Sequence, residues 1–204
     1  MNWMKKVAVA LVCLLPLGLQ AAKVDTLQVK SPSMNKSIEV VVVSPDMAAT
    51  EACPVIYLLH GYGGNARTWV GIKPDLPKIA DEKGIFFVCP DGKNTWYWDS
   101  PLNADVRYET FISDELVKYV DSHYKTVADR KGRAITGLSM GGHGALWNAI
   151  RHSDIFGAAG SMSGGVDIRP FPDNWEMKKQ LGELAANEAV WDSHTVINQV
   201  DKLK

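Results

Sequence analysis

The sequence has little cysteine, no long apolar run and no excess of basic charge. Its 204 residues include three cysteines, and 22 lysines and arginines stand against 23 aspartates and glutamates. This balance leaves no basic surface of the kind that attracts nucleic acid or an anionic membrane. No group of His, Cys and Asp residues has the spacing of a metal site. We therefore expect no nucleic-acid partner, no metal and no cofactor.

The apolar run near the N-terminus is too short to cross a bilayer. Two lysines precede the stretch from Val7 to Leu19, and small residues follow it. A spanning helix needs about 20 apolar residues, whereas this order is typical of a secretory signal peptide. We expect residues 1–21 to be a cleaved signal peptide and residues 22–204 to be the mature domain, secreted or periplasmic and free of the membrane. The alternative is an uncleaved membrane anchor.

The two cysteines after this leader are expected to stay unpaired. Cys53 precedes the apolar segment Val55 to Leu59, and Cys89 ends the apolar segment that begins at Ile85. If both segments are parallel strands, the two thiols lie at opposite ends, about 15–20 Å apart at ~3.3 Å per residue. A disulfide requires Cα atoms within about 7 Å. Export permits a disulfide, but this geometry predicts two buried, free thiols.

Apolar segments alternate with helical patterns along the rest of the chain. Val55 to Leu59 and Ile85 to Val88 are almost continuously apolar, as strands buried on both faces are. Apolar residues at helical spacing predict a helix from about Tyr108 to His123. A second helix is expected from Asp75 to Lys83, and further strands at Thr26–Val29, Ile38–Val43, Arg133–Thr136 and Ala158–Ser161. This alternation predicts one α/β domain with a mostly parallel sheet and helices on both faces.

Gly137-Leu138-Ser139-Met140-Gly141 carries the strongest chemical signal. It reads Gly-x-Ser-x-Gly between an apolar strand and a helix from Gly142 to Ile150, which is the context of a nucleophile elbow. The two glycines allow a turn too tight for Cβ atoms beside the serine. We therefore expect the Ser139 hydroxyl to be presented to a substrate carbonyl as a nucleophile. The plainer interpretation is a glycine-rich turn with a solvated serine.

A glycine-rich loop provides a second element of the same chemistry. Acyl transfer builds an oxyanion that two backbone N–H groups stabilise. One N–H comes from the residue after the nucleophile, here Met140, and the other from a loop after an earlier strand. The run His60-Gly61-Tyr62-Gly63-Gly64 follows the strand that ends at Leu59. We expect this loop, His60 and Gly61 included, to lie against the substrate, unless it is a simple turn.

The long loop from Pro90 to Arg107 contains the aromatic run Trp96-Tyr97-Trp98. Aromatic side chains above a catalytic edge can form the walls of an acyl or sugar pocket. Such side chains can equally attach a loop to the core. Both interpretations stay open, and the first makes Trp96, Tyr97 and Trp98 substrate-binding residues.

No histidine is placed as the base that the serine needs. A serine hydroxyl is a weak nucleophile until a base takes its proton, and in this arrangement an acidic residue and then the histidine follow the serine along the chain. Each of the five histidines has another explanation. His60 lies upstream in the glycine-rich loop, and His123 and His152 end helices, where the dipole favours a cation. His143 points away one turn into the next helix, and His194 falls in a segment expected to be helical (Thr195 to Leu203). His194 alone is in the right chain order.

Taken together, these motifs resemble an esterase family of α/β-hydrolases that includes feruloyl and acetyl-xylan esterases, tributyrin esterase, S-formylglutathione hydrolase and the antigen 85 acyltransferases. The matching stretches are Tyr57 to Gly64, Pro90-Asp91-Gly92, Trp96 to Pro101, Glu109-Thr110 with Glu115-Leu116, and Gly137 to Leu146. The resemblance runs from about residue 36 onward. It implies an α/β-hydrolase fold with Ser139 as nucleophile and the backbone amides of Tyr62 and Met140 as oxyanion hole.

The resemblance also implies a function and a missing part. It implies a serine carboxylesterase that hydrolyses short acyl or aromatic esters through an acyl-enzyme, with carbohydrate-linked acetyl or feruloyl esters as candidate substrates. An acyltransferase and a non-catalytic carbohydrate-binding remnant of the fold are the alternatives. The family's acid and histidine follow two further strands, which nothing here matches. We therefore expect an α/β-hydrolase domain that is incomplete at its C-terminus, with the last strands missing.

Overall fold

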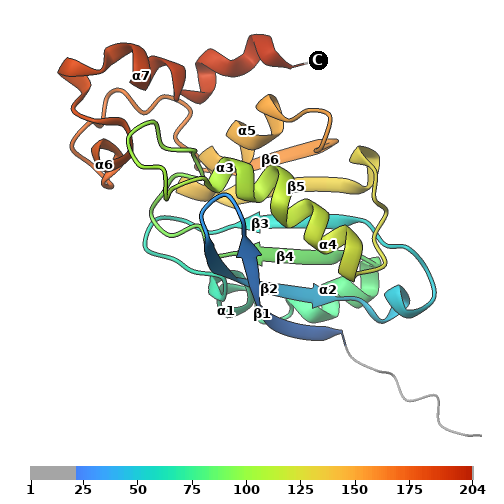
Figure 1. Cartoon of the computed structure of the whole chain (residues 1–204). Helices are drawn as coiled ribbons and strands as arrows, with labels where there is room; N and C mark the ends of the chain where they lie inside the picture. Colours follow the sequence, from blue (N-terminus) through green and yellow to red (C-terminus); the bar gives the residue numbers. More distant parts are fainter. Residues whose placement is uncertain (1–21, 204) are drawn as a thin grey trace, which may run out of the picture.

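The structure, a computed structural model, describes residues 22–203 and is built on a six-stranded sheet (Figure 1). The expected signal peptide, residues 1–21, lies outside the described residues. The strands are β1 (Lys23–Ser31), β2 (Lys36–Ser44), β3 (Val55–Leu59), β4 (Phe86–Pro90), β5 (Arg133–Leu138) and β6 (Ala158–Met162). Every strand predicted from the sequence is present, in most cases longer by a few residues.

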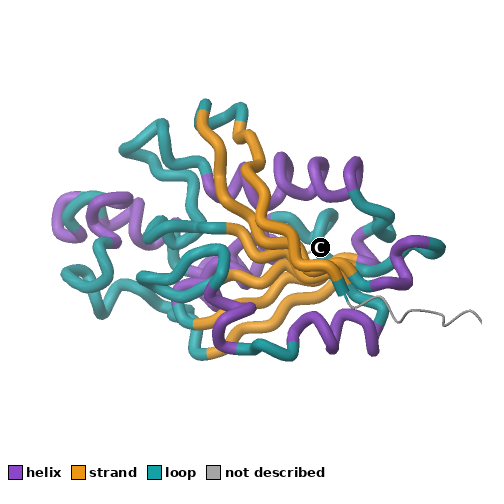
Figure 2. Tube along the Cα trace, turned by 90° about the horizontal axis from the view of Figure 1, so that it is seen from below, coloured by secondary structure: helices purple, strands orange, loops and turns teal. Residues whose placement is uncertain are grey.

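The sheet is mostly parallel, as the sequence predicts. Its strand order is β1-β2-β4-β3-β5-β6. The four strands β4, β3, β5 and β6 run parallel, while β2 is antiparallel to β4 and β1 is antiparallel to β2. Because parallel strands need crossover connections, helices alternate with strands along this part of the chain. Figure 2 shows the strands side by side with helices on both sides of them.

Each face of the sheet buries its own apolar layer. Tyr57 and Leu59 of β3 belong to the larger core cluster, whereas Leu58 belongs to the smaller one. The alternation follows from the pleat, which turns successive side chains to opposite faces. On the smaller side, α2 (Leu76–Lys83) contributes Leu76 and Ala80. The continuously apolar strands are therefore buried on both faces.

The helices vary in length and regularity. The helical segments are α1 (Thr68–Ile72), α2, α3 (Tyr108–Thr110), a π-helical turn (Phe111–Leu116), α4 (Val117–His123), α5 (Met140–Arg151), α6 (Met177–Leu181), α7 (Glu188–Ser193) and 3₁₀ turns at Asp46–Ala49, Arg130–Gly132, Leu184–Ala186 and Val196–Lys202. The helix predicted from Tyr108 to His123 is thus present with a π-helical turn in its middle. The predicted helix from Thr195 is a 3₁₀ helix. No helix among the described residues is long and apolar enough to span a membrane.

Cys53 and Cys89 are both buried and free, as predicted. Burial raises the pKa of the Cys89 thiol, which favours its neutral form. The prediction that the two thiols lie far apart assumed parallel strands. β3 and β4 do run parallel.

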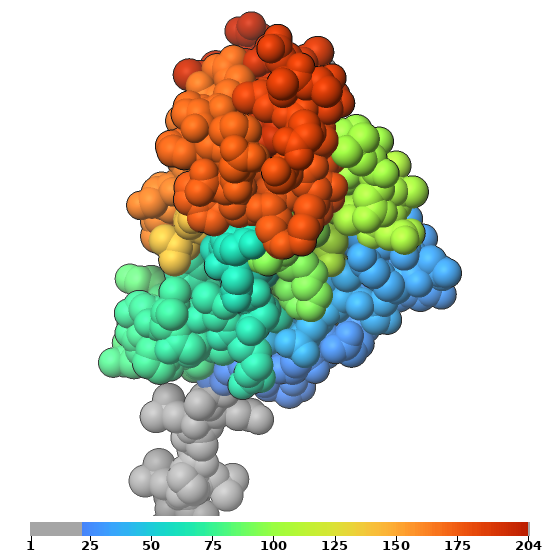
Figure 3. Space-filling model, turned by 90° about the vertical axis from the view of Figure 1, so that its left-hand side faces the viewer, coloured from blue at the N-terminus to red at the C-terminus, as the bar shows by residue number. Residues whose placement is uncertain are grey.

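The C-terminal segment, residues 163–203, lies on the same side of the sheet as α5 (Figure 1). Its backbone accepts hydrogen bonds from the Pro90–Arg107 loop: Trp96 Nε1 donates to Trp175 O over 3.2 Å, and Ser100 Oγ donates to Gln180 O over 2.9 Å. In Figure 3 this segment, coloured orange to red, lies against the residues that follow β3. Three loops that are distant in sequence therefore meet at one end of the sheet.

Candidate active site

Ser139 lies on a sharp turn between β5 and α5. Its backbone has φ 54° and ψ −116°, a conformation that residues other than glycine rarely adopt. A Cβ on Gly141 would lie 2.2 Å from Leu59 O, and one on Gly137 would lie 2.3 Å from the Gly141 carbonyl. Both glycines are therefore required for the turn, as the sequence predicts. Ser139 is exposed at its tip.

The loop His60–Gly64, hereafter the glycine loop, lies directly beside this turn. A Cβ built on Gly61 would lie 3.5 Å from Ser139 Cβ and 3.2 Å from Leu138 O. Within residues 22–203, neither the Tyr62 N–H nor the Met140 N–H donates a hydrogen bond to the protein. Two free backbone donors beside one exposed hydroxyl are what an oxyanion hole requires.

His60 supports the glycine loop from inside. Gly92 N–H donates to His60 Nε2 over 2.9 Å, and His60 Nδ1 donates to Gly61 O over 2.7 Å. The residue is 1% exposed, so no ligand can reach its ring. His60 was expected to lie against the substrate together with its loop; its ring instead faces the protein, where both ring nitrogens are bonded, and does not line the cavity described below.

A cavity of about 280 Å³ opens above Ser139. Its apolar walls include Trp96, Phe171 and Trp175, and its polar lining includes Ser163 and Asp167. The ring centroids of Trp96 and Trp175 are 6.2 Å apart, and those of Phe171 and Trp175 are 5.6 Å apart. The cavity is thus a small aromatic pocket that ends at the serine hydroxyl.

Of the three aromatic residues in the long loop, one lines the pocket and two attach the loop to the core. Trp96 lines the cavity, whereas Tyr97 and Trp98 are both 0% exposed. Trp96 and Tyr97 have left-handed backbones, with φ of 60° and 61°, and the side chains of Tyr97 and Trp98 lie in the core. The expectation that Tyr97 and Trp98 bind substrate is wrong, because they attach the loop to the core instead.

Phe171 and Trp175 were not identified from the sequence. They lie in the segment after β6, which has no helical or strand periodicity to place it. The signal that could have identified them is the one applied to Trp96, namely aromatic side chains in an irregular segment that follows a strand. Asp167, from the same segment, is bound by Arg169, and this contact holds the pKa of its carboxyl below the usual value.

Among the described residues, no histidine side chain forms a hydrogen bond with the Ser139 hydroxyl, and the contact of His143 with Ser139 is a backbone bond from His143 N–H to Ser139 O over 3.0 Å. His143 is fully buried, its Nε2 accepts from Trp98 Nε1, and burial lowers its pKa to about 4. His194 stacks on Trp147 and lines a different hollow, and His152 binds Glu109. The rings of His143 and His194 are thus occupied elsewhere, and His194 lies directly after α7 rather than within the segment expected to be helical. Within the described part of the chain, no three His, Cys, Asp or Glu residues could together hold a metal ion.

Comparisons with known proteins agree with this geometry. The family model described as "Putative esterase" matches residues 31–203. An esterase of Mycobacterium tuberculosis, Esterase Rv1288, is 31% identical over 149 residues, which cover 70% of this chain and 32% of the relative. The chain therefore spans about a third of the length of that curated relative.

Solved structures extend the likeness to three dimensions. A ferulic acid esterase superposes with a TM-score of 0.70 at 28% identity, covering 88% of this chain and 71% of the other. The fluorophosphonate-binding serine hydrolase F of Staphylococcus aureus superposes with a TM-score of 0.78 at 20% identity, covering 90% and 74%, and so shows the fold alone. The sheet, the turn at Ser139 and the family match lead to one conclusion: this chain belongs to the esterase family of α/β-hydrolases.

Proposed function

We propose that this chain is a serine carboxylesterase domain in which Ser139 forms the acyl-enzyme. The observation that carries the proposal is the exposed Ser139 hydroxyl beside the free N–H groups of Tyr62 and Met140. Ser139 Oγ bonds to the ester carbonyl carbon, and the two N–H groups stabilise the oxyanion. The bond to the alcohol then breaks, and the serine proton leaves with the alcohol. Water cleaves the acyl-serine and releases the acid.

The pocket supports a short acyl group or a single aromatic ring as the substrate's acyl part. Its volume of about 280 Å³ is small, and Trp96, Phe171 and Trp175 present apolar faces to it. Aromatic walls of this kind bind planar or sugar-like groups. The similarity to a ferulic acid esterase supports an aromatic acyl group, including one linked to carbohydrate. Export by residues 1–21, to a secreted or periplasmic location, belongs to the same proposal.

The described residues place no histidine where it could activate the serine hydroxyl. Because no histidine side chain within residues 22–203 bonds the Ser139 hydroxyl, the hydroxyl proton has no histidine acceptor there. We expect slow hydrolysis that the oxyanion hole and substrate binding alone support. A histidine and an acidic residue placed to activate Ser139 should make hydrolysis faster by several orders of magnitude, about 10³-fold or more.

A fluorophosphonate probe tests the proposal directly. The 204-residue protein should be labelled slowly at Ser139, whereas Ser139→Ala should not be labelled at all. Added imidazole should accelerate p-nitrophenyl acetate hydrolysis by the wild-type chain above the rate measured with Ser139→Ala, because the free base replaces the absent one. If no label attaches to the wild-type chain while it still binds a feruloylated oligosaccharide, the fold serves as a carbohydrate-binding module instead.

A further inference from the structure

The glycine loop is attached to the long loop at two points that bracket Tyr62. On one side, the Tyr97 hydroxyl donates to His60 O over 3.0 Å. On the other side, Gly63 N–H donates to Asn94 Oδ1 over 2.9 Å. The free N–H of Tyr62 lies between these two bonds along the chain. The direction of that N–H is therefore set by side chains of the long loop.

The Tyr97 ring has no room to move. A Cβ on Gly92 would lie 2.1 Å from Tyr97 Cε1, and one on Gly144 would lie 2.4 Å from Tyr97 Cδ2. Gly144 belongs to α5, the helix that begins directly after Ser139. The ring thus packs against the serine's own helix while its hydroxyl bonds the glycine loop. One rigid side chain fixes the distance between the two parts of the oxyanion hole.

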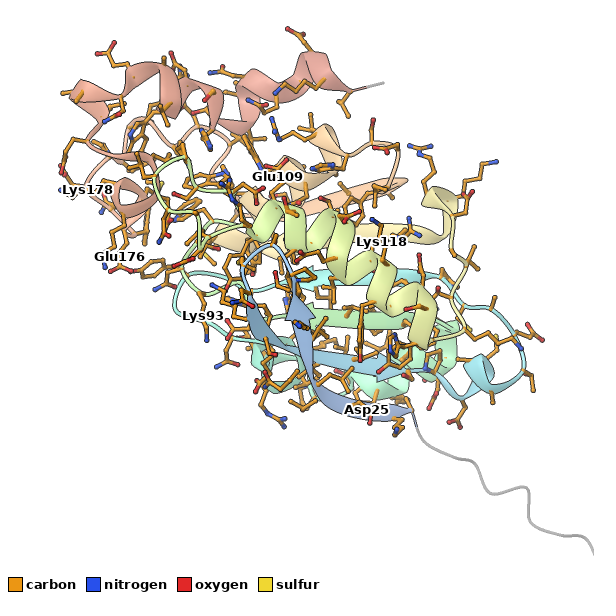
Figure 4. The ribbon with its side chains drawn as sticks, viewed as in Figure 1. Asp25, Lys93, Glu109, Lys118, Glu176 and Lys178 are labelled. Atoms are coloured by element: carbon orange, nitrogen blue, oxygen red, sulfur yellow. The ribbon has the colours of Figure 1, made fainter. Side chains whose placement is uncertain are left out.

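Asn94 connects the glycine loop to the C-terminal segment. Its Oδ1 binds Gly63, and its Nδ2 lies 3.4 Å from Glu176 Oε2. Glu176 follows Trp175, one wall of the pocket, and both residues have left-handed backbones with φ of 56° and 49°. In Figure 4, Glu176 lies at the end of the molecule where Lys93, the neighbour of Asn94, also lies. Asn94 therefore contacts both the glycine loop and the segment that carries the pocket wall.

We propose that Tyr97 and Asn94 are positioning residues that hold the Tyr62 N–H in place for the oxyanion. The proposal rests on the proposed esterase function. The alternative is that both side chains only stabilise the fold. Tyr57 offers a comparison for that alternative, because its hydroxyl is also buried but has no hydrogen-bond partner within the described chain.

The test compares Tyr97→Phe and Asn94→Ala with the control Tyr57→Phe. Each positioning variant removes one bond to the glycine loop, whereas Tyr57→Phe removes a buried hydroxyl that bonds nothing. We expect the Gly63 amide to exchange with solvent about tenfold faster in both positioning variants, measured by nuclear magnetic resonance at equal global stability. Tyr57→Phe should leave that exchange unchanged. Asn94→Asp keeps the acceptor oxygen for Gly63 but loses the Nδ2 contact with Glu176, so slow exchange in this variant would assign the effect to the Gly63 bond.

Fluorophosphonate labelling provides the functional readout. The rate at Ser139 should fall about tenfold in Tyr97→Phe and in Asn94→Ala, and should stay at the wild-type value in Tyr57→Phe. Wild-type labelling rates and wild-type Gly63 exchange in both positioning variants would overturn this inference while leaving the esterase proposal standing. If the wild-type chain is not labelled, the esterase proposal fails, and the Gly63 exchange still decides whether Tyr97 and Asn94 hold the loop.

Discussion

The indole of Trp98 donates a hydrogen bond to the ring of His143, with 2.9 Å between Nε1 and Nε2. The other ring nitrogen of His143, Nδ1, donates to Gly165 O over 2.7 Å. Since Nε2 accepts a hydrogen, the ring is neutral. The bond from Trp98 in the long loop to His143 in α5 therefore exists only while His143 carries no charge.

This arrangement predicts a loss of stability in mild acid. Burial lowers the pKa of His143 from an ordinary value of 6.5 to about 4. Below about pH 6.5 the unfolded chain takes up a proton that the folded chain does not, so stability falls as the pH falls toward 4. Between pH 7 and pH 5 the free energy of unfolding should drop by about 2 kcal/mol from this group. Urea unfolding at the two pH values measures it.

Two substitutions separate His143 from other titrating groups. His143→Gln keeps an acceptor for Trp98 but does not titrate, so the loss between pH 7 and pH 5 should shrink by about 2 kcal/mol. Gln28→Asn changes an exposed side chain without removing a titratable group and should leave the pH profile as in wild type. Burial also lowers the pKa of His194, which adds a smaller loss in the same direction. Identical profiles for wild type and His143→Gln would contradict this account.

Glu109 should be among the most sensitive positions for stability. Its carboxylate accepts from Trp147 Nε1 at 2.8 Å, Arg151 Nε at 2.7 Å and His152 Nε2 at 2.8 Å. Burial alone would raise the pKa of Glu109, but the bonds from His152 and Arg151 hold it below the usual value. Glu109 belongs to α3, and in Figure 4 it lies on the side of α3 that faces α5. The carboxylate thus connects the two helices through a partly buried ion pair.

Glu109→Gln should lower the free energy of unfolding by about 3 kcal/mol, because it leaves the Arg151 charge without its partner. Denaturant unfolding at pH 7 measures the loss. Glu51→Gln, at an exposed position, should change it by less than about 0.5 kcal/mol. Equal stability of the two variants would show that the contacts of Glu109 contribute nothing net.

Gly61 has little room for a side chain. The Cβ of Gly61→Ala would lie 3.2 Å from Leu138 O, closer than ordinary contact, and would displace the glycine loop from the turn at Ser139. We expect the labelling rate at Ser139 to fall about tenfold or more while the fold survives. Gly71→Ala is the matched control, since a Cβ there meets nothing within 4 Å. A wild-type labelling rate in Gly61→Ala would contradict the closeness of the two loops.

The sequence predicts the parts of this molecule that local pattern determines. β3 and β4 are evident because both faces of each strand are buried, and the turn at Ser139 is evident because two glycines are sterically required there. The residues of the pocket walls cannot be predicted from local pattern in this way. Whether Trp96 or Tyr97 faces the ligand depends on left-handed backbones at both residues, and Trp175 is placed by the bond from Trp96 Nε1. Such long-range contacts leave no periodic signal in the sequence.

The two edges of the sheet differ in how they resist association. Within the described chain, β1 pairs only with β2 and β6 pairs only with β5. β1 carries Lys23, Asp25 and Lys30, whereas β6 carries no charge. Charged side chains protect an exposed edge, and an uncharged edge strand can pair with another molecule. Met162 at the end of β6 is 42% exposed, so the edge is also partly apolar.

We therefore expect the 204-residue protein to self-associate through β6. Ala158→Lys places a charge on this edge and should keep the protein monomeric at concentrations where the wild type forms larger species, as measured by light scattering. Ala128→Lys adds the same charge in an exposed loop away from the edge and should associate as the wild type does. If both variants stay monomeric, net charge rather than the edge governs solubility. If neither does, association uses another surface, and β6 is protected despite its composition.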